Sequence, residues 1–314
     1  MRMPRPVLPH SVRRAMQCRI RVKATVALVL ALVAPALPSS PLEAQDPPTV
    51  GPESGTLMLV GGAMRDPALY ARFLELAGGP DAPIVYIPTA GGGEAYDDLC
   101  SCLTAWREHG ARNIRVLHTW DREEADSEAF VAPLRQATGV FFGGGRQWRL
   151  VDAYAGTRIE EAIREVLERG GVVGGSSAGA SIQGSFLVRG DTETNTVMMG
   201  DHQEGFGYLR NVGIDQHVLR RNRHFDLLEV VEARPELLGI GIDEDTALLV
   251  EGDEAEVLGR SYVLVYDNRV GVGDRGGGFY FLAPGDRFDL ATREATRPTR
   301  SLVPVPNVRA GGGD

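Results

Sequence analysis

Short apolar runs alternate with amphipathic segments along the central part of this chain, and that alternation limits the possible folds. Five runs are expected to be strands: Thr56–Val60, Pro83–Pro88, Asn113–His118, Gly139–Phe142 and Gly171–Gly174. The segments between them are expected to be helices: Pro67–Ala77, Ala95–His109, Glu123–Gln136 and Thr157–Arg169. Strands that alternate with helices build a mostly parallel sheet with helices on both faces. The sequence therefore predicts an α/β domain, in which ligands bind where the carboxyl ends of the strands meet.

The two ends of the chain are expected to lie outside this domain. Basic residues up to Lys23 precede an uncharged apolar run over Ala24–Leu37, and small residues follow, as in a secretory signal peptide. We expect cleavage near residue 44, with translation starting at Met1 or at Met16. The expected organisation is a signal peptide over 1–44, a disordered lead-in over 45–55, one α/β domain over 56–308 and a disordered tail over 309–314. The mature protein is then secreted or periplasmic.

A short β segment is expected near the end of that domain, with strands over Ser261–Asp267 and Gly278–Leu282. The sequence contains no internal repeat, and a single domain is expected.

The charge balance of the mature chain argues against several partners. Residues 1–44 hold seven of the 33 basic groups and one of the 42 acidic groups, so the remaining chain has a net charge near −15. Such a surface is a poor partner for nucleic acid and for anionic membranes. Cys100 and Cys102 remain after cleavage, and their C-x-C spacing matches no zinc or redox motif. We expect them to be packing residues on a helix, without a disulfide.

The segment Gly175-Ser176-Ser177-Ala178-Gly179 carries the clearest chemical signal. It has the form G-x-S-x-G and stands between an expected strand and small residues that can open a helix. In that context the pattern predicts a nucleophile elbow, a tight strand-to-helix turn that exposes the hydroxyl of its central serine. Ser177 is then the candidate nucleophile, and the backbone N–H of Ala178 is a candidate oxyanion donor. The alternative is an ordinary Gly/Ser turn, since the chain has 39 glycines.

Two other glycine-rich segments also follow expected strands, at Gly61-Gly62 and at Gly143-Gly144-Gly145. Neither has the G-x-G-x-x-G spacing of a dinucleotide-binding loop. We expect both segments to approach a substrate closely, with the N–H groups of Gly144 and Gly145 as oxyanion donors. Simple turns are the alternative interpretation.

A nucleophilic serine needs a base and an acid that orients it. The histidines after residue 44 are His109, His118, His202, His217 and His224. His217 ends an apolar run amid polar residues, as expected at a cleft, whereas His109 and His118 are expected to be structural. Another apolar run ends in Asp243, Glu244 and Asp245, and spacing alone does not choose among these carboxylates. The order Ser, His, Glu differs from the Ser, Asp, His order of α/β-hydrolases.

Taken together, these segments resemble cyanophycinases, of the S51 serine peptidase family, which also contains peptidase E. The resemblance covers nearly the whole mature chain and rests on FFGGGRQ (141–147), GGSSAGAS (174–181), IDQH (214–217), RNR (221–223) and GIGIDEDTA (239–247). It implies a flavodoxin-like α/β fold, related to class I glutamine amidotransferases, and a homodimer. It also implies a catalytic triad of Ser177, His217 and Glu244 that requires no metal or cofactor.

The resemblance further implies a set of substrate-binding residues: Gln147, Asp215, Gln216, Arg221 and Arg223. The substrate it implies is cyanophycin, a poly-aspartate with arginine attached through the β-carboxyl groups, which is cleaved to β-Asp-Arg dipeptides. Two positions depart from the family pattern. Arg146 replaces an acid, and Asp226 stands where the pattern has a third arginine.

Three functions remain open from the sequence. The first is hydrolysis of cyanophycin or related β-aspartyl peptides, and the second is a peptidase E-like activity on Asp-containing dipeptides. The third is a non-catalytic protein of the same fold that binds acidic peptides.

Overall fold

Five parallel strands form one side of a nine-stranded sheet in the computed structural model, which describes residues 50–269 and 278–298. In spatial order they are β1 (Thr56–Val60), β5 (Val172–Ser176), β4 (Gly139–Phe142), β2 (Ile84–Ile87) and β3 (Ile114–Val116). Each matches one of the five strands expected from the sequence. The predicted signal peptide, its cleavage site and the tail over 309–314 lie outside the described residues.

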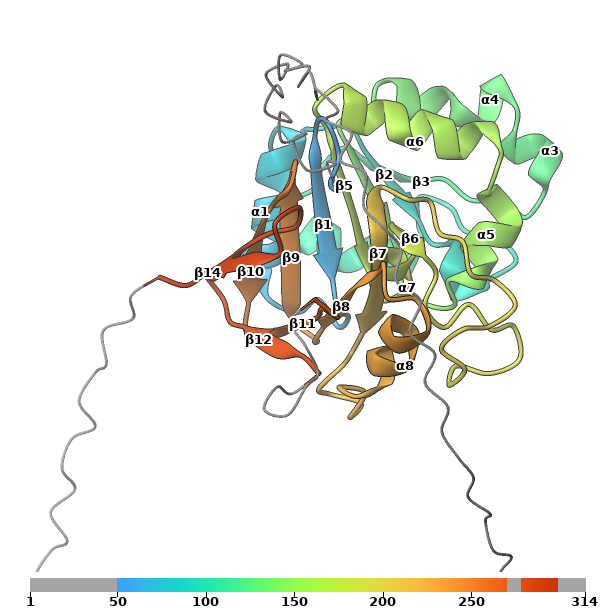
Figure 1. The fold of residues 1–314 in the computed structure, drawn as a ribbon. Coiled ribbons are helices and arrows are strands. Elements are labelled where there is room, and N and C mark those ends of the chain that lie inside the picture. Colours follow the sequence, from blue (N-terminus) through green and yellow to red (C-terminus); the bar gives the residue numbers. More distant parts are fainter. Residues whose placement is uncertain (1–49, 270–277, 299–314) are drawn as a thin grey trace, which may run out of the picture. The chain divides into compact units, whose positions relative to one another are not determined.

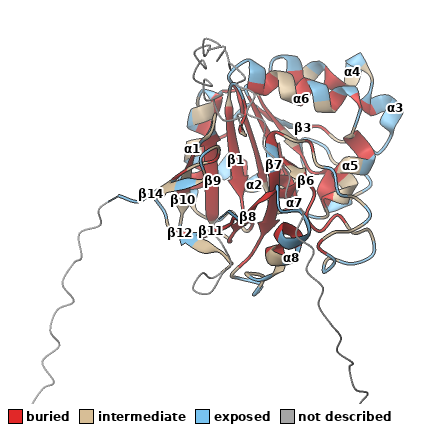
Figure 2. Cartoon of the chain, viewed as in Figure 1, coloured by how far each residue is buried: buried red, intermediate tan, exposed pale blue. Residues whose placement is uncertain are grey.

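Helices cover both faces of these parallel strands (Figure 1). The alternate residues of β1 show why: Leu57 and Leu59 pack in one apolar core, whereas Met58 and Val60 pack in another. The first core includes α6 (Arg158–Glu168) and the second includes α1 (Pro67–Ala77). Strands buried on both faces read as continuous apolar runs, and β1 and β4 are buried along their whole length (Figure 2).

Antiparallel strands extend the sheet beyond β1. Their order is β9 (Thr246–Glu251), β10 (Glu254–Gly259), β13 (Arg287–Asp289) and β14 (Glu294–Thr296). The sequence did not predict this extension. The two C-terminal strands that it predicted, over Ser261–Asp267 and Gly278–Leu282, correspond to β11 (Val263–Tyr266) and β12 (Tyr280–Leu282), which belong to a second sheet.

A second sheet of five strands was not predicted. Its order is β12 (Tyr280–Leu282), β11 (Val263–Tyr266), β8 (Leu238–Ile242), β7 (Leu209–Gln216) and β6 (Gly184–Phe186). Strands β6, β7 and β8 are parallel, so the carboxyl ends of β7 and β8 lie at one edge. The apolar side chains Leu227 and Val230 of α8 (Asp226–Ala233) pack in a core with Leu264 of β11.

The remaining helices are short. They are α2 (Thr104–Glu108), α3 (Arg122–Ala125), α4 (Glu128–Val131), α5 (Trp148–Tyr154) and α7 (Ala178–Ser181), with 3₁₀ turns at Thr89–Gly91, Ser101–Leu103 and Ala132–Arg135. None of the helices within 50–269 and 278–298 is long and apolar enough to cross a membrane.

Two predicted helices are shorter than expected. The first half of the segment 95–109 is not helical, because Asp97 Oδ1 accepts the N–H of Leu99 at 2.9 Å and Asp98 Oδ1 accepts the N–H of Val116 at 2.6 Å. Aspartate side chains that bind nearby backbone groups compete with helix formation in this way. The segment 123–136 is broken at Ser127, whose Oγ accepts the N–H of Phe130 and so caps a new helix.

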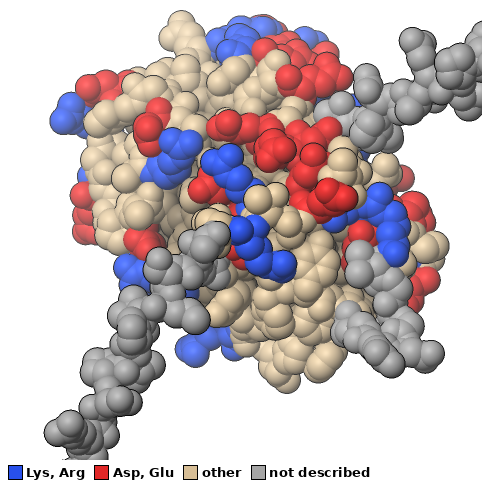
Figure 3. Space-filling view, turned by 60° about the vertical axis from the view of Figure 1, so that its left-hand side comes forward, with Lys and Arg blue, Asp and Glu red and all other residues tan. Residues whose placement is uncertain are grey.

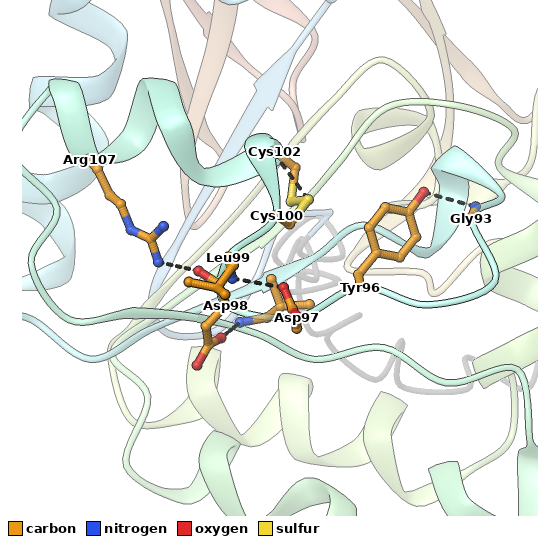
Figure 4. Close-up of a disulfide and its surroundings, with 9 residues drawn as sticks. Gly93, Tyr96, Asp97, Asp98, Leu99, Cys100, Cys102 and Arg107 are labelled. Carbon is orange, nitrogen blue, oxygen red and sulfur yellow. Dashed lines mark hydrogen bonds between the residues drawn. A yellow bond between two sulfur atoms is a disulfide. The ribbon is translucent and has the colours of Figure 1, made fainter.

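The prediction for the two cysteines is wrong. Cys100 and Cys102 form a disulfide (Figure 4). They lie in the turn that precedes α2 rather than on a helix, since Cys100 is the N-cap of the 3₁₀ turn. This turn brings the two Cα atoms to 5.1 Å, within the range that a disulfide requires.

The start of the described chain is bound to the domain. The N–H groups of Val50 and Gly51 both donate to Asp253 Oδ1, at 2.6 and 2.9 Å. These two residues were expected to belong to a disordered lead-in, and their hydrogen bonds instead attach them to the turn between β9 and β10.

Candidate active site

Ser177 lies at a tight turn between β5 and α7, at the carboxyl edge of the parallel strands. Its φ of 56° and ψ of −115° are unusual for a residue with a side chain. The flanking glycines allow the turn, because a Cβ on Gly175 would lie 2.1 Å from the carbonyl oxygen of Gly179. A Cβ on Gly179 would lie 2.3 Å from the carbonyl oxygen of Phe142. The elbow that the G-x-S-x-G pattern predicted is therefore present.

Three side chains form a continuous hydrogen-bonded chain at this elbow. His217 Nε2 lies 2.9 Å from Ser177 Oγ, and His217 Nδ1 lies 2.8 Å from Glu244 Oε1. His217 directly follows β7, and Glu244 follows β8, so the second sheet supplies both partners of a serine held by the first. The imidazole is thus placed to accept the serine proton while the carboxylate fixes its orientation.

The three adjacent carboxylates have different partners. Asp243 Oδ1 accepts the N–H groups of Leu219 and Arg220 at 3.1 and 2.9 Å, which holds the turn after His217. Asp245 Oδ1 accepts the N–H groups of Arg65 and Asp66 at 2.5 and 3.2 Å. Among these three, Glu244 is the residue that contacts the imidazole.

Gly61 and Gly62 hold the histidine instead of a substrate, contrary to our expectation for that segment. The carbonyl oxygen of Gly61 accepts the N–H of His217 at 2.9 Å. A Cβ on Gly62 would lie 2.1 Å from His217 Cε1, so the glycine backbone packs directly against the imidazole ring. The carbonyl oxygen of Gly62 also accepts the N–H of Asp245. The loop after β1 therefore joins the ends of β7 and β8.

The surroundings of His217 favour its neutral form. Burial lowers the pKa of the imidazole, and the hydrogen bond to Glu244 opposes this effect. The positive charges of Arg221 and Arg223 lower the pKa further. A histidine with a lowered pKa stays available as a proton acceptor at mildly acidic pH.

Three backbone N–H groups are available beside the serine. Gly144 is close to it, since a Cβ on Gly144 would lie 3.4 Å from both Ser177 Cβ and the carbonyl oxygen of Ser176. Gly145 has a φ of 147° and lies against the carbonyl of Ala90. Within the part of the chain that the structure describes, the N–H groups of Gly144, Gly145 and Ala178 have no hydrogen-bond acceptor. All three thus remain candidate oxyanion donors.

Two residues expected to bind substrate are completely buried instead. Gln147 has no exposed surface, and its Nε2 donates to the carbonyl oxygen of Val188 at 2.5 Å. Asp215 is also fully buried and forms a bidentate ion pair with Arg189. Nε of Arg189 lies 2.8 Å from Oδ1, and Nη2 lies 3.0 Å from Oδ2. These groups contact other parts of the protein, whereas Gln147 Oε1 is buried and has no hydrogen-bond partner among the described residues. The substrate-binding role of both residues stays a prediction.

Gln216 is also buried, and its substrate-binding role likewise stays a prediction. It is 2% exposed, and its Oε1 accepts a hydrogen bond from Arg223 Nη1 at 3.1 Å. The side chain of Arg223 is largely buried, and burial together with the nearby Arg189 lowers the pKa of its guanidinium. Gln216 therefore helps to orient Arg223. Arg221 is exposed.

Arg189 was not anticipated from the sequence. It is 2% exposed and also forms an ion pair with Asp226, the residue that departs from the family pattern. A single arginine between Val188 and Gly190 gives no sequence signal for this role. Arg146, the other departure, donates from Nη2 to the carbonyl oxygen of Asp191.

The other histidines have separate contacts. His109 packs against Tyr70, with 4.4 Å between ring centroids, and His118 Nδ1 lies 2.8 Å from Thr89 Oγ1. His202 Nε2 lies 2.8 Å from Asp152 Oδ1. The ring of His224 packs against that of Phe225.

Comparison with known proteins matches this chain to one family. The model of peptidase family S51 matches residues 57–258. The cyanophycinase of Synechococcus elongatus is 36% identical over 227 residues, which are 68% of this chain and 69% of that relative. The cyanophycinase of Geminocystis herdmanii is 34% identical over 226 residues, which are 68% of this chain and 81% of that relative.

One solved structure supports the fold. The crystal structure of a peptidase from an acI-B1 Actinobacterium covers 77% of this chain and 97% of its own, with a TM-score of 0.56 and 24% identity. The α/β fold predicted from the sequence is confirmed.

Proposed function

The chain belongs to peptidase family S51 and is a serine peptidase, and from this premise we propose that Ser177, His217 and Glu244 are its catalytic triad. The observation that carries the proposal is the hydrogen-bonded chain from Ser177 Oγ through the imidazole to Glu244 Oε1 at a nucleophile elbow. Such a chain recurs on unrelated folds and is recognised by its geometry rather than by residue order.

The proposed reaction begins when Ser177 Oγ attacks a peptide carbonyl carbon and His217 Nε2 takes the hydroxyl proton. Glu244 stabilises the imidazolium, and the N–H groups of Ala178 and of Gly144 or Gly145 bind the oxyanion. The imidazolium then protonates the leaving amine, which leaves an acyl group on the serine. Water hydrolyses that acyl-enzyme by the same steps with the histidine again as base. Loss of one oxyanion donor raises the barrier by about 3 kcal/mol.

We propose that the substrates are aspartyl or β-aspartyl peptides, with cyanophycin as the first candidate. The named relatives support this choice. The exposed Arg221 and the largely buried Arg223 lie in the turn directly after His217. A guanidinium binds a carboxylate through two parallel hydrogen bonds, so these arginines suit the carboxylate of an aspartyl residue.

A specific observation keeps a peptidase E-like activity as the second candidate. Where the cyanophycinase pattern has a third arginine, this chain has Asp226, and that carboxylate is paired with Arg189. The site therefore has one cation fewer than the pattern, which favours a smaller substrate with fewer carboxylates, such as an Asp-containing dipeptide.

A fluorophosphonate probe tests the triad, because it reacts with activated serines. We expect the wild-type protein to be labelled at Ser177, as located by peptide mapping, and the Ser177→Ala variant to remain unlabelled. A wild-type protein that is not labelled would instead be a non-catalytic binding protein. Incubation with cyanophycin and with a panel of Asp dipeptides, followed by mass analysis of the products, then separates the two candidate substrates.

We also propose that the protein is exported, with removal of residues 1–44, and that it forms a homodimer. The basic stretch and apolar run at the start of the sequence support export, and the family resemblance supports the dimer. N-terminal sequencing of the mature protein and analytical ultracentrifugation test these two proposals.

A further inference from the structure

The carboxylate of Glu244 has a second partner besides His217. Its Oε1 contacts His217, and its Oε2 lies 3.3 Å from Nη2 of Arg65. The side chain of Arg65 is 69% exposed, whereas that of Glu244 is 15% exposed. The guanidinium therefore lies on the solvent side of a carboxylate whose other oxygen faces the imidazole.

Arg65 is held in place by its own backbone. Its N–H donates to Asp245 Oδ1 at 2.5 Å, and its Nη1 lies 3.6 Å from Asp245 Oδ2. The same Asp245 donates its backbone N–H to the carbonyl oxygen of Gly62. The loop after β1 and the turn after β8 are thus joined on both sides of Arg65, which restricts where its side chain can reach.

We propose that Arg65 is a positioning residue of this active site, which holds Glu244 by its outer oxygen and so keeps the inner oxygen on His217. Its positive charge also limits how strongly the carboxylate favours the imidazolium form of the histidine. This inference rests on the proposed triad. It concerns a residue that does not contact the reacting atoms and acts through Glu244.

The other charged groups around His217 and Glu244 stay in place when Arg65 is replaced. Arg221 and Arg223 face His217 and disfavour its protonation, and Asp243 and Asp245 flank Glu244. Asp215 lies two residues before the histidine, and its charge is matched by Arg189. Replacement of Arg65 by alanine therefore removes one cation from the outer face of Glu244 and keeps its backbone hydrogen bond.

The test measures the rate at which a fluorophosphonate labels Ser177 between pH 4 and pH 9, which requires no knowledge of the substrate. In this reaction Oγ forms a bond to phosphorus, fluoride leaves with its electron pair, and His217 takes the hydroxyl proton. We expect Arg65→Ala to lower the plateau rate about threefold to tenfold, as for a modest displacement of one group of a catalytic unit. We expect the acid limb of its pH–rate profile, where labelling is lost as His217 becomes protonated, to move to higher pH by about 0.4 unit. This is the effect of a unit charge roughly 7 Å away in a water-like medium.

Two further variants distinguish this role from a general effect on the surface. Arg65→Lys keeps the charge, so its acid limb should match the wild type while its plateau stays lower. Arg260→Ala is the matched control, because Arg260 is a neighbouring exposed arginine that pairs with Asp66 and does not contact Glu244. It should keep both the plateau and the acid limb.

The outcomes are separable. An acid limb of Arg65→Ala that stays in place or moves to lower pH overturns the proposal, as does an equal loss in Arg260→Ala. A loss of labelling accompanied by a lower melting temperature in Arg65→Ala, with no effect of Arg65→Lys on the plateau, assigns a merely structural role and also overturns it. A wild-type protein without label at Ser177 contradicts the proposed function itself.

Discussion

Ser177 has an unusual backbone conformation, and the close packing of its glycine neighbours, rather than its hydroxyl, sets this turn. We therefore expect Ser177→Ala to fold with an unchanged melting temperature and to lose roughly 10⁴- to 10⁶-fold in kcat, the usual effect of removing a nucleophile. Hydrolysis rate and thermal unfolding of the variant are the measurements.

Ser176→Ala is the matched control for this prediction. Ser176 is the last residue of β5 and lies outside the hydrogen-bonded chain to His217. We expect it to keep activity within about threefold of the wild type, in line with a substitution that removes no catalytic group. If Ser176→Ala were inactive and Ser177→Ala active, the nucleophile would be assigned to the wrong residue.

The lowered pKa of His217 gives a prediction for the pH profile. Burial is the main cause of the shift, and Glu244 opposes it. Because the imidazolium cannot accept the serine proton, activity must fall as the pH drops through this pKa. The half-maximal rate should lie below the ordinary histidine value of about 6.5. The pH dependence of labelling at Ser177 by a neutral fluorophosphonate measures it, and a midpoint at or above 6.5 contradicts the prediction.

At this same scale, the sequence predicted the elbow at Ser177 and the position of His217 at a cleft, because each directly follows an apolar strand. Spacing alone did not choose among Asp243, Glu244 and Asp245, since neighbouring carboxylates differ in the directions that the backbone gives them, and only the family resemblance implied Glu244. Asp245 has a φ of 52°, which turns the chain away after Glu244. The sequence also gave no signal for Arg189, whose partners Asp215 and Asp226 come from other segments of the chain.

At the scale of elements, the site depends on the contact of one loop with two strand ends. The loop after β1 accepts the N–H of His217 through Gly61 and packs against its ring through Gly62. Local patterns predicted each of the three elements, but a pattern with a range of a few residues cannot say that β7 and β8 form a separate sheet. The contact of these strand ends with the loop after β1 joins segments far apart in the sequence, such as Gly61 and His217.

Gly62→Ala tests that contact. The added Cβ would lie 2.1 Å from His217 Cε1, so the imidazole must move by about 1 Å or more. We expect kcat to fall roughly 100-fold, since a misplacement of this size has that effect on catalysis. The labelling rate of Ser177 measures the loss.

Gly110→Ala is the control for backbone strain. Gly110 also has a positive φ, at 104°, and a Cβ there would have no atom within 4 Å. We expect it to lower the free energy of unfolding by about 1 to 3 kcal/mol and to keep the wild-type labelling rate. If both alanine variants lose activity equally, strain rather than displacement of the histidine explains the loss in Gly62→Ala.

At the scale of the whole molecule, the net charge of the chain is negative, whereas the turn after His217 is basic. The full chain has a net charge of −9, yet the turn after His217 carries Arg220, Arg221 and Arg223. Within the described ranges, Arg220 and Arg221 form no ion pair. Figure 3 shows acidic and basic side chains side by side on the face that it presents, without one continuous basic area. At long range, an acidic substrate is therefore repelled by the negative net charge of the molecule. At short range, it is attracted by the exposed arginines.

The salt dependence of kcat/KM shows whether the negative net charge or the local arginines govern association with an acidic substrate. Ions screen charges beyond about 10 Å at 0.1 M salt, and local contacts are screened less. We expect the arginines to dominate, so that kcat/KM for an Asp-containing peptide falls severalfold between about 0.01 M and 0.5 M salt. The same peptide with its carboxylates blocked as amides should change little, and Arg221→Ala should flatten the response to the acidic one. If kcat/KM for the acidic peptide instead rises with salt, repulsion by the whole molecule dominates, and the arginines do not select acidic substrates.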